Sequence, residues 1–299
     1  MISVSGDDLL QGHSDTELFQ YIAESRQLVP SSRLSLLSAN LVAKQYEPNE
    51  VEDAVHAIAF AQQLSIPTPH VKRVITDQQN AYCIMDCIEG ITLEHMWSNL
   101  GWFLTIKVAL QLRRIIKRLQ SATSFTAGSL VSGECRSFWL DDRYGLPPRS
   151  KSADVACFYR FWANFTTMRN AMQAATHGRV ADSEERSCLE SKNFVFTHHD
   201  LAPRNILLAP SGEIWILDLD FAGFYPIYFE YASMQNFDMP REWNILAQLR
   251  WYLFTWVAVG HYEQSARILR HIRSKFTQIP AGRRFELLKT GGPSRYPVS

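Results

Sequence analysis

The sequence has no excess of either charge. Its 299 residues include 30 lysines and arginines and 30 aspartates and glutamates. Binding to nucleic acid or to an anionic membrane depends on concentrated positive charge, so this balance gives no support to either partner. We therefore expect no nucleic-acid partner and no membrane partner, and we expect specificity to come from a pocket.

Cysteines and long apolar runs are also scarce. The five cysteines are odd in number and scattered, and they lack the spacing of metal ligands. The first residues lack the basic and then apolar order of a signal peptide, and no apolar run approaches the roughly 18 residues that a membrane helix needs. The sequence therefore predicts a cytoplasmic protein with reduced thiols, and it does not indicate an oligomeric state.

Glycine is absent between Val29 and Lys44. A loop that lays backbone N–H groups over phosphate normally needs glycine for close approach and unusual dihedral angles. Either small side chains substitute for glycine here, or this part of the chain has no true phosphate loop. The small residues available are Ser31, Ser32, Ser35, Ser38 and Ala39.

The most informative segment that is present is THHDLAPRNILL, residues 197–208. An apolar strand at 194–196 is expected to deliver His198, His199 and Asp200 to a rigid edge. Asp200 can accept the proton of an attacking hydroxyl, and Asn205 can point its amide oxygen at a hard cation that bridges phosphate oxygens. The spacing predicts a phosphate-transfer loop.

A hairpin is predicted directly after this loop. Residues 205–208 and 213–217 have the pattern of two paired strands, with turn residues at 209–212. The returning strand ends at Asp218, which the hairpin brings beside Asn205. Together the two side chains are therefore predicted to chelate one Mg²⁺.

Three neighbouring features leave alternatives open. Asp220 is either a second acid beside the metal or the cap of the following turn. Arg204 either neutralises the transferred phosphoryl group or is an ordinary exposed loop arginine. A zinc hydrolase site at His198 and His199 is disfavoured, because no HExxH motif and no set of cysteine partners accompanies them.

Together these motifs resemble the aminoglycoside phosphotransferase-like (choline kinase/APH-type) family, whose signature is H-x-D-x-x-x-x-N, a hairpin and I-x-D. Four further segments are similar to runs of the fungal branch of this family: SIPTP, MDCIEGITL, LDLDFAGFYP and FEY, at 65–69, 85–93, 217–226 and 229–231. The matches come in the expected order, and the resemblance spans roughly residues 34–231.

The resemblance implies a two-lobed, protein-kinase-like α+β fold. A small antiparallel-sheet lobe at 1–88, with a hinge at 86–88, would bind the nucleotide, and a mainly helical lobe at 89–299 would carry catalysis and acceptor binding. It also implies ATP and Mg²⁺ as cofactors, Asp200 as the catalytic base, and Asn205 and Asp218 as metal ligands. His198 would brace the catalytic loop through a backbone hydrogen bond. His199 replaces a glycine that is usual in the family and is expected to crowd the cleft.

In the first lobe, Lys44 is predicted to lie on the second strand of a hairpin, with its amine near the nucleotide phosphates. Kinase-like folds usually steady this lysine with a glutamate on the next helix. The predicted helix, 51–64, holds Asp53 at that position, one methylene shorter. We therefore expect either a looser ion pair with Lys44 or a tighter closure of the lobe.

The predicted strand 82–85 leads into the hinge. The backbone of Asp86 and Ile88 is expected to hydrogen-bond the adenine edge, while Met85 lines the base pocket. Beyond the hinge, Thr92 is a predicted helix N-cap, and 102–120 has the apolar periodicity of a buried helix.

The carboxyl-terminal third mixes aromatic residues with acids. This mixture can hold an amine-bearing or ring-bearing acceptor through cation–π and ion-pair contacts, or most of the rings can simply be core. The aromatic set is Tyr228, Phe229, Tyr231, Phe237, Trp243, Trp251 and Trp256, and the acids are Glu230, Asp238 and Glu242. A basic helix at 263–276 is expected to present a solvated face.

The predicted function is ATP-dependent phosphate transfer to a hydroxyl of a small molecule, such as an aminoglycoside-like compound, an amino-alcohol or a secondary metabolite. The alternative is a pseudokinase, a regulatory or interaction protein with weak or no phosphoryl transfer. The missing glycine loop, Asp53 and His199 support that alternative. A kinase of protein substrates is disfavoured, because no D-F-G and no A-P-E closes an activation segment after Asp218.

Overall fold

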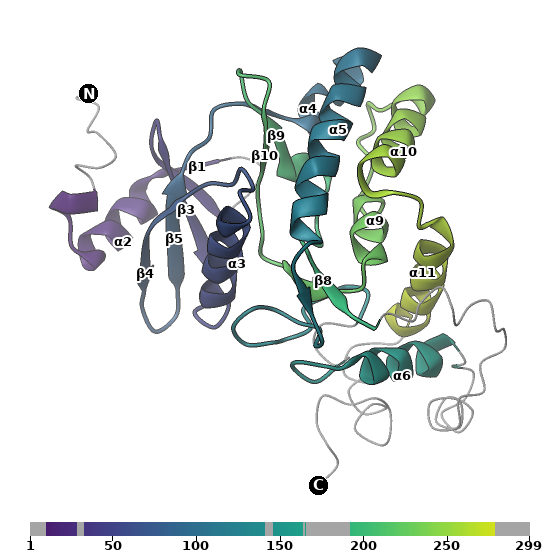
Figure 1. Ribbon diagram of the computed structural model, residues 1–299. Helices are drawn as coiled ribbons and strands as arrows, with labels where there is room; N and C mark the ends of the chain where they lie inside the picture. The colour runs from purple at the N-terminus through teal and green to yellow at the C-terminus, as the bar shows by residue number, and fades with distance from the viewer. Residues whose placement is uncertain (1–9, 29–32, 141–145, 164, 166–191, 279–299) are drawn as a thin grey trace, which may run out of the picture. The chain divides into compact units, whose positions relative to one another are not determined.

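The computed structural model describes residues 10–28, 33–140, 146–163, 165 and 192–278 (Figure 1). The chain divides into two compact units, of which the first combines Met1–Leu93 with Asn205–Asp220. The second unit combines Glu94–Arg204 with Phe221–Ser299. The boundary runs through the predicted phosphate-transfer loop, so that Asp200 belongs to the second unit and Asn205 to the first. The predicted functional lobes, 1–88 and 89–299, stay a prediction.

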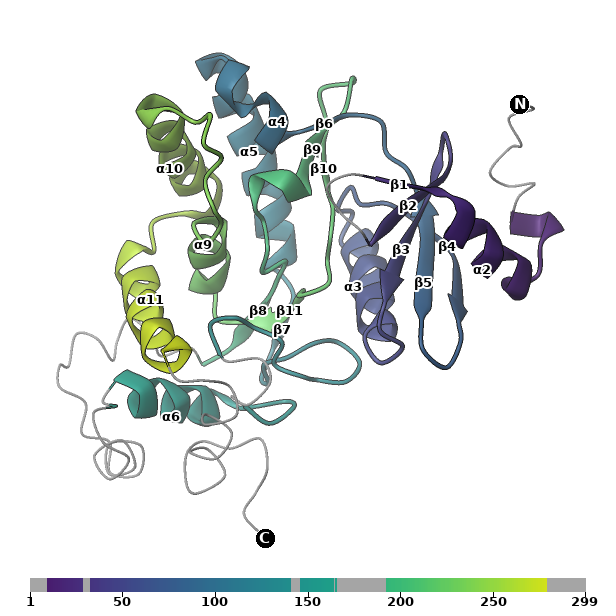
Figure 2. The same ribbon diagram turned by 180° about the vertical axis from the view of Figure 1, so that it is seen from behind.

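The first unit is built on a five-stranded antiparallel sheet with the order β1-β2-β3-β5-β4 (Figures 1 and 2). The strands are β1 (Arg26–Gln27), β2 (Leu34–Ser38), β3 (Leu41–Tyr46), β4 (Val71–Thr76) and β5 (Ala81–Asp86). The predicted β2–β3 hairpin and the strand before the hinge are therefore confirmed. Lys44 lies on β3, the central strand of the sheet.

Two helices cover the two faces of this sheet. Alternate residues of β3 point to opposite faces, and the two sets enter different hydrophobic clusters. Leu41 and Ala43 pack with residues of α2 (Asp15–Glu24), whereas Val42 and Tyr46 pack with residues of α3 (Val51–Gln63). By this alternation Lys44 belongs to the α3 face. The predicted helix at 51–64 is confirmed, one residue shorter than expected.

The predicted hairpin after the catalytic loop is also present. Strands β9 (Ile206–Leu208) and β10 (Ile214–Ile216) pair antiparallel, and β6 (Ile91–Thr92) adds a third strand beside β9. A Cβ at Gly90 would overlap the Leu207 side chain and come within 2.6 Å of the Leu208 carbonyl oxygen, so only glycine permits this approach. Thr92 directly precedes the short helix α4 (Leu93–Met96), at the predicted N-cap position, and it also pairs with Leu207 as the last residue of β6.

The second unit is mainly helical. Its helices are α5 (Trp102–Leu119), α6 (Ser152–Ala163), α9 (Tyr228–Met234), α10 (Ile245–Val259) and α11 (Glu263–Thr277). Helix α10 packs on α5 and α9, and α11 packs on α9 and α6. A small antiparallel sheet with the order β11-β8-β7 carries the chain into the catalytic loop (Figure 2). Its strands are β7 (Thr123–Ser124), β8 (Phe194–Thr197) and β11 (Gly223–Tyr225).

Aromatic rings form much of the core of this unit. The Trp97 ring contacts the rings of Trp243, Trp251 and Phe254, with centroids 5.1–5.5 Å apart. Five of the seven rings considered as acceptor contacts are buried, namely Tyr228, Phe229, Tyr231, Trp243 and Trp251, and Trp256 is exposed. The alternative that these rings are part of the core therefore holds for most of the seven residues. In the part of the chain that the structure describes, no helix has both the length and the apolar composition to span a membrane.

Candidate active site

The catalytic loop begins where the buried strand β8 ends, and Glu230 anchors its backbone. This carboxylate, on α9, accepts the backbone N–H of His198 at 2.8 Å and that of His199 at 3.2 Å. The Asp200 N–H in turn donates to His198 Nδ1 at 3.2 Å. It is a hydrogen bond between the His198 side chain and the loop backbone, which is the contact that the resemblance implies for His198. The turn that presents Asp200 is thus held from both a side chain and a neighbouring helix.

Glu230 is completely enclosed by protein. Burial raises the pKa of its carboxyl group to about 7, since desolvation disfavours the charged form. The two backbone N–H groups oppose this shift, and the nearby charge of Asp200 adds to it. Sequence reasoning counted Glu230 among the acceptor-site acids. Glu230 lies more than thirty residues from His198 in the chain, so no local sequence pattern indicated its contact with the catalytic loop.

His199 does not behave as expected from the sequence. Its backbone has the positive φ of 69° that suits a glycine, but the imidazole is fully buried within the second unit. The ring stacks on Phe138 at a centroid distance of 4.6 Å and lies between Ser137 Oγ and Ser233 Oγ, at 2.7 and 3.0 Å from its two nitrogens. The expectation that His199 crowds the cleft is therefore wrong, because both nitrogens are satisfied in the core. Burial lowers the pKa of the imidazole to about 3, so the ring is neutral.

We expect His199→Gly to destabilise the protein despite relieving the backbone. A positive φ costs a non-glycine residue about 1–2 kcal/mol, whereas removing a buried ring and its hydrogen bonds costs about 3–5 kcal/mol. The net loss should be about 2–3 kcal/mol in the free energy of unfolding, measured by urea denaturation. Ser65→Gly is the matched control, because Ser65 has a φ of 58° but is exposed, and this change should be neutral or slightly stabilising. Equal stability of His199→Gly and wild type would contradict a packing role.

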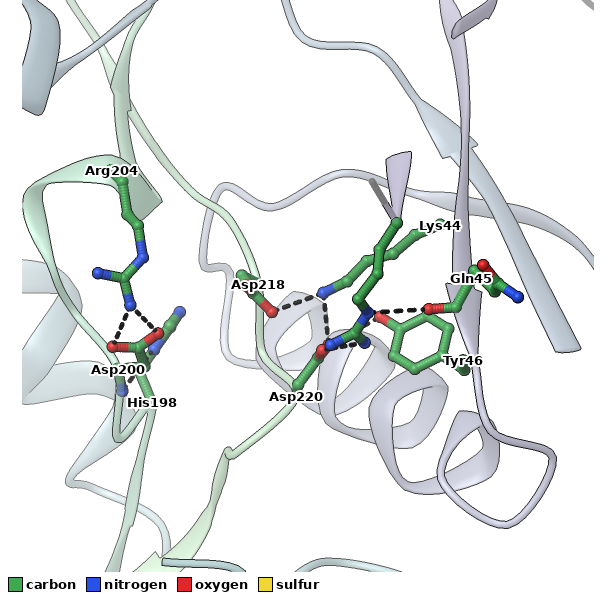
Figure 3. A network of polar contacts seen from close by, with 9 residues as sticks. Lys44, Gln45, Tyr46, His198, Asp200, Arg204, Asp218 and Asp220 are labelled. Carbon is green, nitrogen blue, oxygen red and sulfur yellow. Dashed lines mark hydrogen bonds and ion pairs between the residues drawn. The ribbon is translucent and has the colours of Figure 1, made fainter. Parts of the chain in front are cut away.

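Asp200 forms an ion pair with Arg204, four residues later in the chain. Arg204 lies in a 3₁₀ turn that spans Pro203–Asn205. Arg204 Nη2 lies 3.0 and 2.7 Å from the two Asp200 oxygens. Figure 3 shows the two contacts as dashed lines. The Asp200 side chain is 12% exposed and the Arg204 side chain 46% exposed. A half-exposed cation that contacts both oxygens of a nearly enclosed carboxylate holds that carboxylate in one orientation.

In the first unit, two acids hold the Lys44 ammonium. Its Nζ lies 2.6 Å from Asp218 Oδ1 and 2.7 Å from Asp220 Oδ1 (Figure 3). The sequence predicted Asp53 as the partner of Lys44, and the ion pairs described for this lysine are instead with Asp218 and Asp220. Asp53 is buried on α3, but an aspartate has a shorter reach than the glutamate usual there. The proposed part of Asp53 in nucleotide binding stays a prediction.

Asp220 is an ion-pair partner of Lys44 and Arg33, a role that was not predicted, and its place as a second acid beside the metal stays a prediction. Its carboxylate accepts hydrogen bonds from Lys44 Nζ, from the Tyr46 hydroxyl at 2.8 Å and from Arg33 Nη2 at 3.1 Å. Burial raises its pKa, as does the neighbouring charge of Asp218, while Lys44 and Tyr46 lower it. Sequence reasoning missed Arg33 and Tyr46. The alternation of β3 was the signal available for Tyr46, since it places this residue on the same face as Lys44.

Asn205 and Asp218 lie at the open end of the hairpin. The Leu217 N–H donates to the Asn205 carbonyl at 2.9 Å, directly beyond the last strand pair, Ile206 with Ile216. Asp218 has a φ of 65°. One carboxylate and one amide oxygen suit Mg²⁺, which usually keeps several waters and takes few protein ligands. Among the described residues, no group of three or more His, Cys, Asp or Glu side chains is arranged to hold a metal.

The hinge has a single N–H group available to a ligand. The Asp86 N–H donates to the His70 carbonyl at 3.1 Å, and the Cys87 N–H donates to the Asn40 carbonyl at 2.9 Å. Within the described ranges the Ile88 N–H donates to no other residue. Of the hinge residues predicted to meet adenine through the backbone, Ile88 therefore fits as a donor, and Asp86 does not. Met85 is buried in the cluster on the α3 face of the sheet.

The chain is similar to known phosphotransferases in sequence and in fold. The model of the phosphotransferase enzyme family matches residues 31–262. No curated protein sequence matches the chain. Among solved structures, a thermostable mutant of aminoglycoside phosphotransferase APH(4)-Ia in its apo form is 15% identical, with a TM-score of 0.51 over 93% of this chain and 99% of that one. ADP-bound aminoglycoside phosphotransferase APH(2'')-Ib is 12% identical, with a TM-score of 0.51 over 92% of this chain and 96% of that one.

At these identities the structural likeness speaks for the fold. It confirms the predicted protein-kinase-like α+β class, with an antiparallel five-stranded sheet and a mainly helical remainder. The family model goes further, because it covers well over half of the chain, including the catalytic loop, the hairpin and Lys44. The chain therefore belongs to the phosphotransferase enzyme family.

Proposed function

We propose that the protein is an ATP-dependent phosphotransferase that acts on a hydroxyl group of a small molecule. One observation carries this proposal: the backbone around Asp200 is fixed by Glu230 and His198, and its side chain, paired with Arg204, is still 12% exposed. A general base must be held in one orientation and yet be reachable by the proton that it takes.

The other site residues support the same reaction. Lys44 offers a buried cation for nucleotide phosphates, and Asn205 with Asp218 offers oxygen ligands for Mg²⁺. When bound, that ion would neutralise charge that develops on the phosphate oxygens. Arg204 keeps Asp200 oriented, and its half-exposed guanidinium is the cation that we propose for the transferred phosphoryl group. The Ile88 N–H would donate to the adenine edge.

The acceptor class is proposed from the family and the fold relatives. Aminoglycoside phosphotransferase APH(4)-Ia has been solved in a ternary complex with ADP and hygromycin B, and that structure is 15% identical to this chain with a TM-score of 0.51. We propose a polar acceptor that carries a hydroxyl and an amine, of aminoglycoside, amino-alcohol or secondary-metabolite type. A cytoplasmic location stays a prediction.

The test is ADP formation from ATP in the presence of a panel of amino sugars, amino-alcohols and hydroxylated metabolites, with Mg²⁺ or with EDTA. Acceptor-stimulated, Mg²⁺-dependent ADP formation, together with a phosphorylated acceptor found by mass spectrometry, is the expected result. ATP binding without transfer to any acceptor would favour the pseudokinase alternative. Absence of both binding and transfer by a folded protein would contradict the proposed function.

A further inference from the structure

Two cationic side chains from the glycine-free stretch 29–44 form ion pairs with Asp220. Lys44 Nζ lies 2.7 Å from Oδ1, and Arg33 Nη2 lies 3.1 Å from Oδ2, so each carboxylate oxygen holds one cation. Both cations also lie over the Tyr46 ring, with the ammonium 5.0 Å and the guanidinium carbon 5.4 Å from its centroid. The Tyr46 hydroxyl donates to the same carboxylate, at Oδ1.

Strand pairing fixes the position of Arg33. Leu34, the next residue, pairs with Lys44 in the β2–β3 register. The Gln45 N–H donates to the Arg33 carbonyl at 2.8 Å, and Arg33 Nε donates back to the Gln45 carbonyl at 3.2 Å. The guanidinium is therefore held to β3 beside Lys44 while half of its side chain stays exposed. A phosphate oxygen can reach it from solvent.

The charges of this cluster balance only without a ligand. Lys44 and Arg33 carry two positive charges, and Asp218 and Asp220 carry two negative charges. If Asp218 becomes a ligand of a divalent cation, its negative charge is neutralised by that cation and no longer balances the positive charge of Lys44. The remaining group of Lys44, Arg33 and Asp220 then carries one net positive charge, which favours binding of an anion.

We propose that Arg33 and Lys44, positioned by Asp220, form a side-chain clamp for the phosphates of a nucleoside triphosphate. The clamp takes the place of the backbone N–H groups that a glycine-rich loop would supply. Arginine is suited to this part, because its planar guanidinium can bind Asp220 with one edge and phosphate oxygens with another. The inference rests on the proposed function, since it assigns further residues to the nucleotide site.

The experiment measures binding by isothermal titration calorimetry, with Mg²⁺ present, for ATP, inorganic triphosphate and adenosine. Arg33→Gln should weaken binding of ATP and of triphosphate about tenfold or more, which corresponds to loss of one charge-assisted contact of about 1.4 kcal/mol. Binding of adenosine should change less than about twofold, because that ligand has no phosphate. Arg33→Lys, which keeps the charge but not the fork, should recover part of the loss.

Arg26→Gln is the matched control, since Arg26 is an exposed arginine of β1 in the same sheet. It should bind all three ligands as wild type does. The melting temperature of each unliganded variant shows whether the sheet is intact. Equal ATP affinity of Arg33→Gln and wild type would overturn the clamp and leave the proposed function standing. An equal loss of affinity for adenosine and for ATP in Arg33→Gln would have the same meaning. Failure of wild type to bind ATP would overturn both.

Discussion

Asp200→Asn should lower kcat by about 10²–10⁴-fold, the range that removal of a positioned general base produces. Asparagine keeps the shape of the side chain and the hydrogen bond from Arg204, but it cannot accept a proton from the acceptor hydroxyl. The Kd for ATP should stay within about twofold of wild type, because Asp200 is expected to contact the acceptor and not the nucleotide. Rapid-quench or coupled ADP assays measure kcat, and calorimetry measures Kd.

Stability should hardly change in this variant. The ion pair of Asp200 with the half-exposed Arg204 contributes at most about 1 kcal/mol. Asp154→Asn is a suitable control, because Asp154 accepts the Lys151 N–H at the start of α6 and asparagine keeps a side-chain oxygen that can accept the same N–H. The control should keep both stability and turnover. Wild-type kcat in Asp200→Asn, with a phosphorylated acceptor still formed, would remove Asp200 from the role of base.

Local patterns in the sequence were sufficient for the elements that present the site. Strands β8, β9 and β10 each follow from short apolar runs bounded by turn residues, and the hairpin register then places Asp218 near Asn205. Helix α3 and the β2–β3 hairpin were predicted in the same way. These features depend on neighbours in the chain, so periodicity and turn chemistry determine them.

The partners of the site residues could not be predicted in this way. Lys44 has Asp218 and Asp220 as partners, more than 170 residues away in the chain, and the expected partner Asp53 is only nine residues away. No periodicity connects such positions, because the choice depends on which segment the fold brings beside β3. The prediction that His199 crowds the cleft was wrong for a related reason. Its sequence position implied a bulky side chain at a loop, whereas two serines and three aromatic rings make an internal site for it.

Glu230→Ala should destabilise the protein by about 4 kcal/mol, because it leaves the backbone N–H groups of His198 and His199 buried without an acceptor, at about 1–3 kcal/mol each, and opens a cavity. Glu230→Gln removes the titratable group while keeping its volume and one acceptor oxygen. Together the two variants separate the role of the acceptor from the role of the charge. Urea denaturation gives the free energy of unfolding for both.

The titration of Glu230 should also make stability fall as pH rises. Its pKa is raised from 4.5 in the unfolded chain to about 7, so the folded state binds the extra proton between these values. The contribution is complete below pH 4.5 and is lost as pH rises through 7, by about 3 kcal/mol in all. His199 acts in the opposite sense, since its pKa of about 3 in place of 6.5 makes stability rise with pH up to 6.5.

Comparison of wild type with Glu230→Gln at each pH cancels the contribution of His199, because that residue is present in both. The stability of wild type relative to this variant should therefore decrease by about 3 kcal/mol between pH 4.5 and pH 8. The same ionisation bears on function, because the carboxylate form is a stronger acceptor for the N–H groups that fix the catalytic loop. A difference in stability that is constant across this range would show that Glu230 has the same pKa in the folded and unfolded chain.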